Sequence, residues 1–132
     1  MHGASRTWIS STLATEAVAL AAARATLDVM TNEGVCDTLH RQGARLFSGL
    51  RTLSATYADL LRGLSGVPEM CFLHYATEEI SQAVARECAR RGLLFKRTAY
   101  NFVSLAHDDA TIDGTLATLD EVLRGIRSRV SS

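Results

Sequence analysis

The sequence predicts an α/β domain in which a small, mostly antiparallel three-stranded sheet is covered by helices and preceded by a long alanine-rich helix. Three observations favour this class: an alanine-rich run near the N-terminus, short apolar segments between turn residues in the middle, and apolar residues in helical steps at the C-terminus. The 132 residues suit one domain, and 47% hydrophobic residues are enough to form its core.

Two helices are predicted in the first half of the chain. The alanine-rich run from 14 to 30 follows Ser10, Ser11 and Thr12, which are typical helix-capping residues. Alanine on most faces of this helix predicts burial between layers. After a break at residues 32–34, a stripe of Val35, Leu39, Leu46, Leu50 and Leu53 predicts a second helix. Its extension through residues 57–61 stays open, and the residues Gly63, Ser65, Gly66 and Pro68 predict a turn that ends it.

The second half predicts three strands and two helices. The strands are expected at residues 69–75, 92–96 and 102–106, the last two antiparallel because their connection is short. Between the first two strands, Thr77 is expected to cap a helix and Gly92 to stand just after its end. The last helix is expected to begin at Asp108 or Asp109. Its stripe is Ile112, Leu116, Leu119, Leu123, Ile126 and Val130.

Composition excludes several classes of function. Fourteen basic residues balance fourteen acidic ones, so we expect no nucleic-acid partner. The sequence has no apolar run of about 18 residues and no secretory signal, so we expect no membrane partner. Three cysteines without a CxxC pair fit a reducing compartment, and we expect a cytoplasmic location.

Three motifs in order carry a resemblance to a known family. They are the segment Trp8-Ile9-Ser10-Ser11-Thr12-Leu13-Ala14-Thr15-Glu16, a middle part with a Gly-Val-Pro turn and an Arg-Gly-Leu-Leu helix end, and the tail Phe102-Val103-Ser104-Leu105-Ala106-His107-Asp108-Asp109 followed by Ile112-Asp113. Together they resemble class III pyridoxal-phosphate-dependent aminotransferases, in the branch of glutamate-1-semialdehyde aminomutase. The resemblance implies that residues 1–132 form the C-terminal small domain of a fold-type I enzyme, with 1–14 as the junction to a large domain.

The resemblance also implies a cofactor contact. In the family a threonine at this junction reaches a cofactor phosphate, typically the one bound by the other subunit. The matching position here is Thr12, and we expect both Ser11 and Thr12 to bind the cofactor. Hydroxyls and free N–H groups at a helix start suit an anion, although an ordinary N-cap is the alternative. Many relatives carry a Gly-Asn-Pro-like segment after the threonine, where this chain has Ala14, Thr15 and Glu16.

A lysine that binds the cofactor covalently is missing from the expected place. Transamination needs such an amine, and in the family it lies upstream of Thr12. The only lysine of this chain is Lys96, which is expected to be a solvated strand-end charge. We therefore expect no catalytic residue here, weak or no binding of pyridoxal phosphate by the chain alone, and as partner a missing large domain or a second copy. The alternative is a non-catalytic module that docks on an intact aminotransferase.

Other candidate residues have structural interpretations. Cys36 with His40 and Cys71 with His74 lack the spacing of a zinc site, so we expect no metal. His107 is expected to cap the turn before the last helix. A sharper hypothesis places Lys96, Arg97 and Tyr100 at an active-site mouth, where they would hold a substrate carboxylate.

Overall fold

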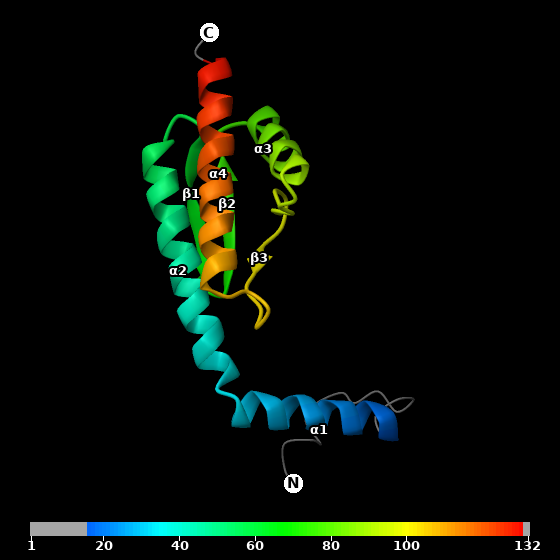
Figure 1. The fold of residues 1–132 in the computed structure, drawn as a ribbon. Coiled ribbons are helices and arrows are strands. Elements are labelled where there is room, and N and C mark those ends of the chain that lie inside the picture. Colours follow the sequence, from blue (N-terminus) through cyan, green and yellow to red (C-terminus); the bar gives the residue numbers. More distant parts are fainter. Residues whose placement is uncertain (1–15, 131–132) are drawn as a thin grey trace, which may run out of the picture. The chain divides into compact units, whose positions relative to one another are not determined.

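The computed structural model describes residues 16–130 and confirms the predicted fold class (Figure 1). The elements in order are α1 (Ala17–Asn32), α2 (Val35–Thr56), β1 (Leu61–Val67), β2 (Met70–Tyr75), α3 (Glu78–Arg90), β3 (Asn101–Phe102) and α4 (Asp109–Val130). The strands form one antiparallel sheet in the order β1-β2-β3. The chain divides into two units, residues 1–35 and 36–132, which are described separately.

The first unit contains α1, which differs from the expectation in two respects. It begins at Ala17 rather than 14, because the Glu16 carboxylate caps it by accepting hydrogen bonds from the N–H groups of Val18 and Ala19. The predicted cap at Ser10, Ser11 and Thr12 lies outside the described residues. None of the residues of α1 is buried, so the predicted burial between layers is not achieved within the described chain.

The second unit is built on a β-hairpin that the sequence analysis did not predict. Leu61–Val67 pairs with Met70–Tyr75, and Pro68 and Glu69 form the connection. The predicted turn at residues 63–68 is therefore wrong, and the helical extension through residues 57–61, which the sequence left open, is not formed, because α2 ends at Thr56. Gly63 and Gly66 have φ of 134° and 101°, which fit a strand with a bulge between Leu61 and Gly63. Pairing with β2 outweighs the weak strand propensity of glycine.

The third strand is also shorter and differently paired than predicted. Asn101–Phe102 pairs with β2, with Met70 opposite Phe102 and Cys71 opposite Asn101. Residues 93–96 form no strand, so the predicted pair of residues 92–96 with 102–106 is wrong. Their burial still alternates, because Phe95 is 8% exposed and Leu94 is 88% exposed. This alternation explains the error, since it is the pattern of a half-buried strand.

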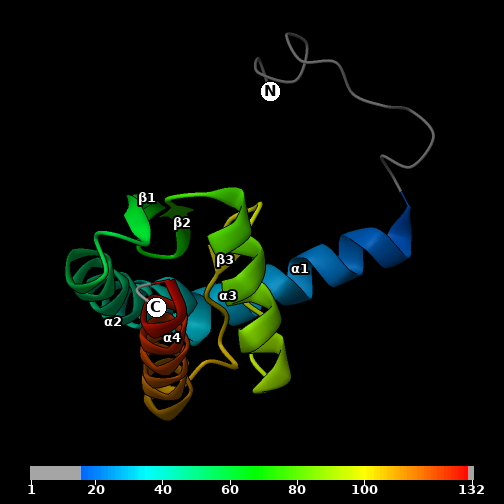
Figure 2. The same cartoon turned by 90° about the horizontal axis from the view of Figure 1, so that it is seen from above.

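The core lies between the hairpin and the helices. Figures 1 and 2 show α2 and α4 side by side over one face of the β1–β2 hairpin, while α3 packs against α4 and β2. Most positions of the predicted stripes of α2 and α4 are confirmed as core positions, whereas Leu39 and Leu116 are half-buried and the prediction for Val130 is wrong, since it is 66% exposed at the end of α4. The fully buried side chains include Leu50, Leu60, Leu73, Val84, Leu119 and Leu123.

Two glycines of α2 allow this packing. A Cβ atom at Gly43 would lie 2.5 Å from the carbonyl oxygen of Pro68, and one at Gly49 would overlap the side chain of Leu116 in α4. The helix therefore approaches both the hairpin turn and α4 more closely than any side chain at these positions permits.

Helix ends within this unit follow local rules. Thr77 accepts a hydrogen bond from the N–H of Ile80 and caps α3, as predicted. At the other end Gly92 has φ of 79°, and the N–H groups of Gly92 and Leu93 bond to the carbonyls of Ala89 and Cys88. This is a Schellman motif, which reverses the chain after the helix.

Ionic contacts join α2 to the start of α4. Arg45 binds Asp113 at 2.7 and 2.6 Å, and Arg41 binds Asp109 at 3.0 Å. The buried Gln42 also donates to Asp109 at 2.7 Å. Hydrogen bonds from Gln42 and Arg41 lower the pKa of Asp109 below its usual 3.8. The hydrogen bond from Arg45 lowers the pKa of Asp113 in the same direction.

We predict opposite effects of alanine at two helical glycines. Gly43→Ala should lower the free energy of unfolding by about 1–3 kcal/mol, because the rigid Pro68 backbone must move. Gly114→Ala in α4 should raise it by about 0.5–1 kcal/mol, because helix propensity improves and the new Cβ meets no atom within 4 Å. Urea unfolding measures both. Equal effects would contradict the close approach at Gly43.

We also predict a loss of stability in acid. Asp109 and Asp113 have lower pKa values in the folded chain than in the unfolded chain. Their stabilisation is therefore complete above the usual value of 3.8 and is lost as the pH falls through the lowered values. The urea midpoint should fall between about pH 5 and about pH 2. The double variant Asp109→Asn, Asp113→Asn should begin lower and fall less steeply, whereas Asp28→Asn in α1 should behave like the unaltered chain.

Candidate functional site

The predicted cofactor contacts, Ser11 and Thr12, lie outside the described residues. Among the described residues, the candidate site is the connection between α3 and α4, together with the sheet face beside it. This segment contains Lys96, Arg97, Tyr100 and His107, each of which the sequence analysis considered.

The side chain of Asn101 holds the two ends of the connecting loop together. Its Oδ1 accepts from the backbone N–H of Lys96 at 2.8 Å, and its Nδ2 donates to the carbonyl of Lys96 at 3.1 Å. Asn101 thus replaces a neighbouring strand by satisfying both backbone groups of one residue. The loop of residues 97–100 is closed at its base by this pair of bonds.

Aromatic side chains gather on the sheet face that points away from the helices. Phe72 contacts His74 edge-on with ring centroids 4.8 Å apart, and Tyr100 with centroids 6.1 Å apart. Phe102 is 58% exposed, and the ammonium group of Lys96 lies 5.4 Å from its ring centroid. Alternation along the strands explains this face, since Cys71 and Leu73 point into the core.

The two cations of the loop have different partners. Lys96 lies over Phe102, whereas Arg97 forms an ion pair with Glu78 at 2.5 Å. Arg97 also lines a cavity of about 300 Å³ with Phe72, His74 and Ser81. A substrate carboxylate that binds both Lys96 and Arg97 would therefore have to displace Glu78 from Arg97. Tyr100 lies beside Phe72 and is 40% exposed.

The side chains of Cys71 and His74 point to opposite faces of β2. Cys71 is buried while His74 is exposed and lies 2.9 Å from the Ser65 hydroxyl. His40 lies 2.6 Å from Glu69. Burial raises the pKa of the Cys71 thiol, and it raises that of Cys88 to about 11, so both thiols stay protonated near neutral pH. Within residues 16–130, no three potential metal ligands of the His, Cys, Asp and Glu types come together.

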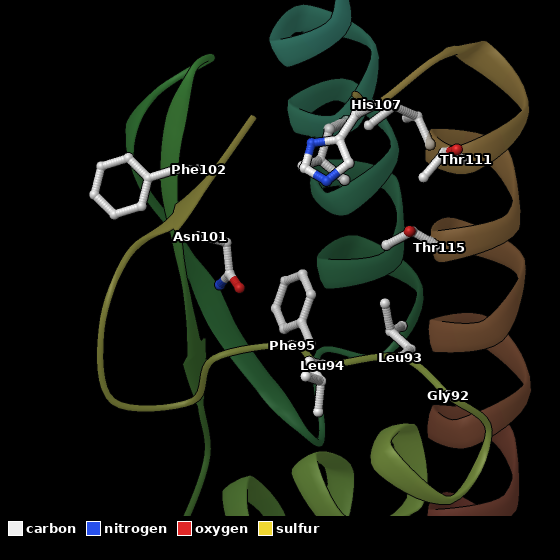
Figure 3. Close-up of a pocket in the computed structure, with 11 residues that line it drawn as sticks. Gly92, Leu93, Leu94, Phe95, Asn101, Phe102, His107, Thr111 and Thr115 are labelled. Carbon is white, nitrogen blue, oxygen red and sulfur yellow. The ribbon is translucent and has the colours of Figure 1, made fainter. Parts of the chain in front are cut away.

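His107 caps the turn before α4, as predicted. Its Nδ1 accepts a hydrogen bond from the backbone N–H of Ser104 at 3.0 Å. The backbone N–H of His107 donates to the Ser104 carbonyl at 3.1 Å. Asp108 then caps α4 by accepting from the N–H of Thr111 at 2.8 Å. The imidazole projects into a cavity of about 330 Å³ beside Phe95 and Thr115 (Figure 3).

The described residues do not form a site that fits pyridoxal phosphate. Lys96, the only lysine of the sequence, is exposed and rests on the ring of Phe102. Covalent binding of an aldehyde cofactor needs an amine enclosed beside the cofactor and partly deprotonated. On the open sheet face, the described residues do not enclose the amine of Lys96 in a pocket for such a cofactor.

The amino-acid sequence is similar to part of a longer known protein. Over 89% of its length, the chain is 28% identical to a glutamate-1-semialdehyde 2,1-aminomutase of Desulfitobacterium hafniense, of which it covers 30%. The chain resembles the glutamate-1-semialdehyde aminomutase branch of class III aminotransferases. No family model matches it.

The fold is similar to that of part of a longer protein whose structure has been solved in a form with pyridoxal phosphate. The Sphingopyxis FumI protein in its "PLP internal aldimine form" matches 98% of the chain with a TM-score of 0.78 and 24% identity. The chain covers 32% of that protein. It therefore spans about a third of the length of both proteins. No helix within residues 16–130 is long and apolar enough to cross a membrane.

Sequence reasoning missed Asn101, because it treated residues 97–101 as a simple connection. An asparagine at the end of a short polar loop could have signalled a side chain that bonds to nearby backbone. The partnership of Arg97 with Glu78 joins residues 19 apart and had no local signal.

We predict that Asn101 controls the opening of the loop. Asn101→Ala should raise hydrogen exchange at the Lys96 amide by about tenfold or more, because it removes two hydrogen bonds of about 1 kcal/mol each. Asn101→Asp keeps an acceptor for that amide and should exchange at an intermediate rate. Exchange at Leu119 in α4 serves as the control. Unchanged exchange at Lys96 in both variants would contradict the role of Asn101.

Proposed function

We propose that this chain is the small-domain portion of a pyridoxal-phosphate-dependent class III aminotransferase or aminomutase, which transfers an amino group on an amino acid or amine. The observation that carries the proposal is the match of nearly the whole chain, in sequence and in fold, to about a third of two longer proteins. The cofactor would supply the electron sink for the transfer. The covalent lysine would come from a large domain.

In this proposal Ser11 and Thr12 contact the cofactor phosphate through their hydroxyls. At the start of α1, the N–H groups that could bind a phosphate have another acceptor. The Glu16 carboxylate already accepts from the N–H groups of Val18 and Ala19, so these donors of α1 are used and a second anion there would be repelled. The hydroxyls of Ser11 and Thr12, rather than the end of α1, would therefore bind the phosphate.

The exposed apolar side chains of α1 support a partner for this helix. Val18 is 75% exposed, Leu20 55% and Leu27 61%, and exposed apolar surface of this kind favours association. We propose that α1 packs against the large domain, or against a second copy where that domain is absent. A module that docks on an intact aminotransferase would use the same surface and stays the alternative.

Cofactor binding tests the proposal. The purified chain mixed with pyridoxal phosphate should give no saturable absorbance band and no amino-group transfer to a keto acid, because Lys96 is solvated. Joined to its large domain, the chain should bind pyridoxal phosphate more tightly than pyridoxal. Thr12→Ala should reduce that preference by roughly tenfold, because this is the change in affinity expected when one hydrogen bond to a charged group is lost. Thr31→Ala, at the far end of α1, is the matched control.

Two results would decide against this proposal. A saturable band in the isolated chain that is lost in Lys96→Ala, together with transfer activity, would make the chain an enzyme by itself. The coding sequence upstream of Met1 separates the remaining possibilities. A reading frame with a lysine roughly 30 residues before Thr12 supports a portion of an enzyme, and its absence supports the docking module.

A further inference from the structure

The cavity beside His107 is lined by residues of the second unit. It lies between residues 92–95, β3 and the first turns of α4, and has a volume of about 330 Å³ (Figure 3). Its apolar walls include Leu46, Leu93, Phe95 and Ile112. Its lining residues, all within the described part of the chain, include no Asp, Glu, Lys or Arg. A charged ligand would therefore lose its hydration without gaining a counter-charge.

The hydrogen bond from Ser104 determines which nitrogen of His107 carries the proton. Nδ1 accepts from the N–H of Ser104 at 3.0 Å, and a ring nitrogen that accepts has no proton of its own. The neutral imidazole therefore carries its proton on Nε2, which is a donor. Figure 3 shows the ring directed into the space between Asn101, Phe95 and Thr115. The ring nitrogen that is farther from the backbone points into this space. Among the described residues, no acceptor for this Nε2–H is found.

Thr115 of α4 supplies a second polar group to the cavity. It is half-buried, lines the cavity and stands one turn after Thr111 on α4. The hydroxyl of Thr111 is engaged by Asp108 at 2.6 Å. Within the part of the chain that the structure describes, the Thr115 hydroxyl has no such partner. One ring donor and one hydroxyl without partners among the described residues thus line a cavity whose apolar walls include Phe95 and Ile112, and a few polar groups among apolar walls are typical of small-molecule sites.

We propose that this cavity binds a small uncharged molecule with an apolar body and a carbonyl oxygen. The body packs between Leu46, Phe95 and Ile112. The carbonyl oxygen accepts from Nε2 of His107 and from the hydroxyl of Thr115. The amide Nδ2 and Oδ1 of Asn101 are occupied by Lys96, so Asn101 forms a wall and does not select the ligand.

Titration of the ¹⁵N-labelled 132-residue chain with acetanilide tests the site, because this probe has an aromatic ring and an amide carbonyl. Saturable shifts in ¹H–¹⁵N spectra are expected at residues 93–95, 107 and 115. Benzylammonium keeps the ring but has a charge and no carbonyl, and should bind at least about tenfold more weakly. A ring-nitrogen spectrum of His107 should show the Nε2–H tautomer.

Matched variants separate the two donors. His107→Asn keeps an acceptor near the position of Nδ1 for Ser104 and removes Nε2–H, and Thr115→Val removes the hydroxyl at nearly constant shape. Each should weaken acetanilide binding by roughly fivefold, the size of one net hydrogen bond. Thr52→Val in α2, outside the cavity, should bind like the unaltered chain.

Three results would overturn the proposal: equal affinity in the unaltered chain and the cavity variants, shifts that map elsewhere, or equal affinity for benzylammonium. If His107→Asn disturbs the turn, Thr115→Val decides alone, since a valine in α4 leaves the Ser104 contact in place. The cofactor experiment uses other variants, Thr12→Ala and Lys96→Ala, and another readout, so failure of this proposal and failure of the proposed function are distinguishable.

Discussion

At Gly43 the backbone of α2 meets the backbone of Pro68, with no room for a side chain between them. This contact places the β1–β2 turn against the first half of α2, so that Leu46 and Leu50 face the hairpin across the core. On the same helix Gly49 accommodates Leu116 of α4. The hairpin and α4 are thus both positioned by one helix, and the ionic contacts of Arg41 and Arg45 select the register between α2 and α4.

The candidate site follows from this framework through the end of α3. Gly92 reverses the chain, Phe95 anchors it in the core, and Asn101 satisfies the backbone of Lys96 where a strand would otherwise be needed. The segment therefore crosses the domain without joining the sheet. A cavity remains between this segment and α4, where residues 92–95 run beside the helix as irregular chain and not as a strand of the sheet.

Nucleophilic side chains among the described residues differ in their burial. The thiols of Cys71 and Cys88 are buried and protonated, and Lys96 is solvated over an aromatic ring. Glu16, which the resemblance would place after the phosphate-binding threonine, uses its carboxylate to cap α1. Because Glu16 is used in this way, the proposed phosphate contact depends mainly on the hydroxyls of Ser11 and Thr12.

The sequence by itself determined the parts of the fold that depend on local hydrogen bonds and periodic burial. Thr77, Gly92 and Asp108 mark helix ends because their caps involve backbone groups within about one turn. The apolar stripes of α2 and α4 were legible because every third or fourth residue meets the same core. The class of fold followed from the same local signals, whereas the family resemblance came from three motifs in order.

Only the tertiary structure decided the strands and the site around them. The glycines of β1 look like a turn until β2 pairs with them, and residues 93–96 look like a strand until Asn101 replaces the missing neighbour. The Nε2–H of His107 is a donor only because Ser104 folds back onto Nδ1, and it faces a cavity only because α4 and residues 92–95 meet there. Pairing and cavity formation depend on groups distant in sequence, whose contacts have no local pattern.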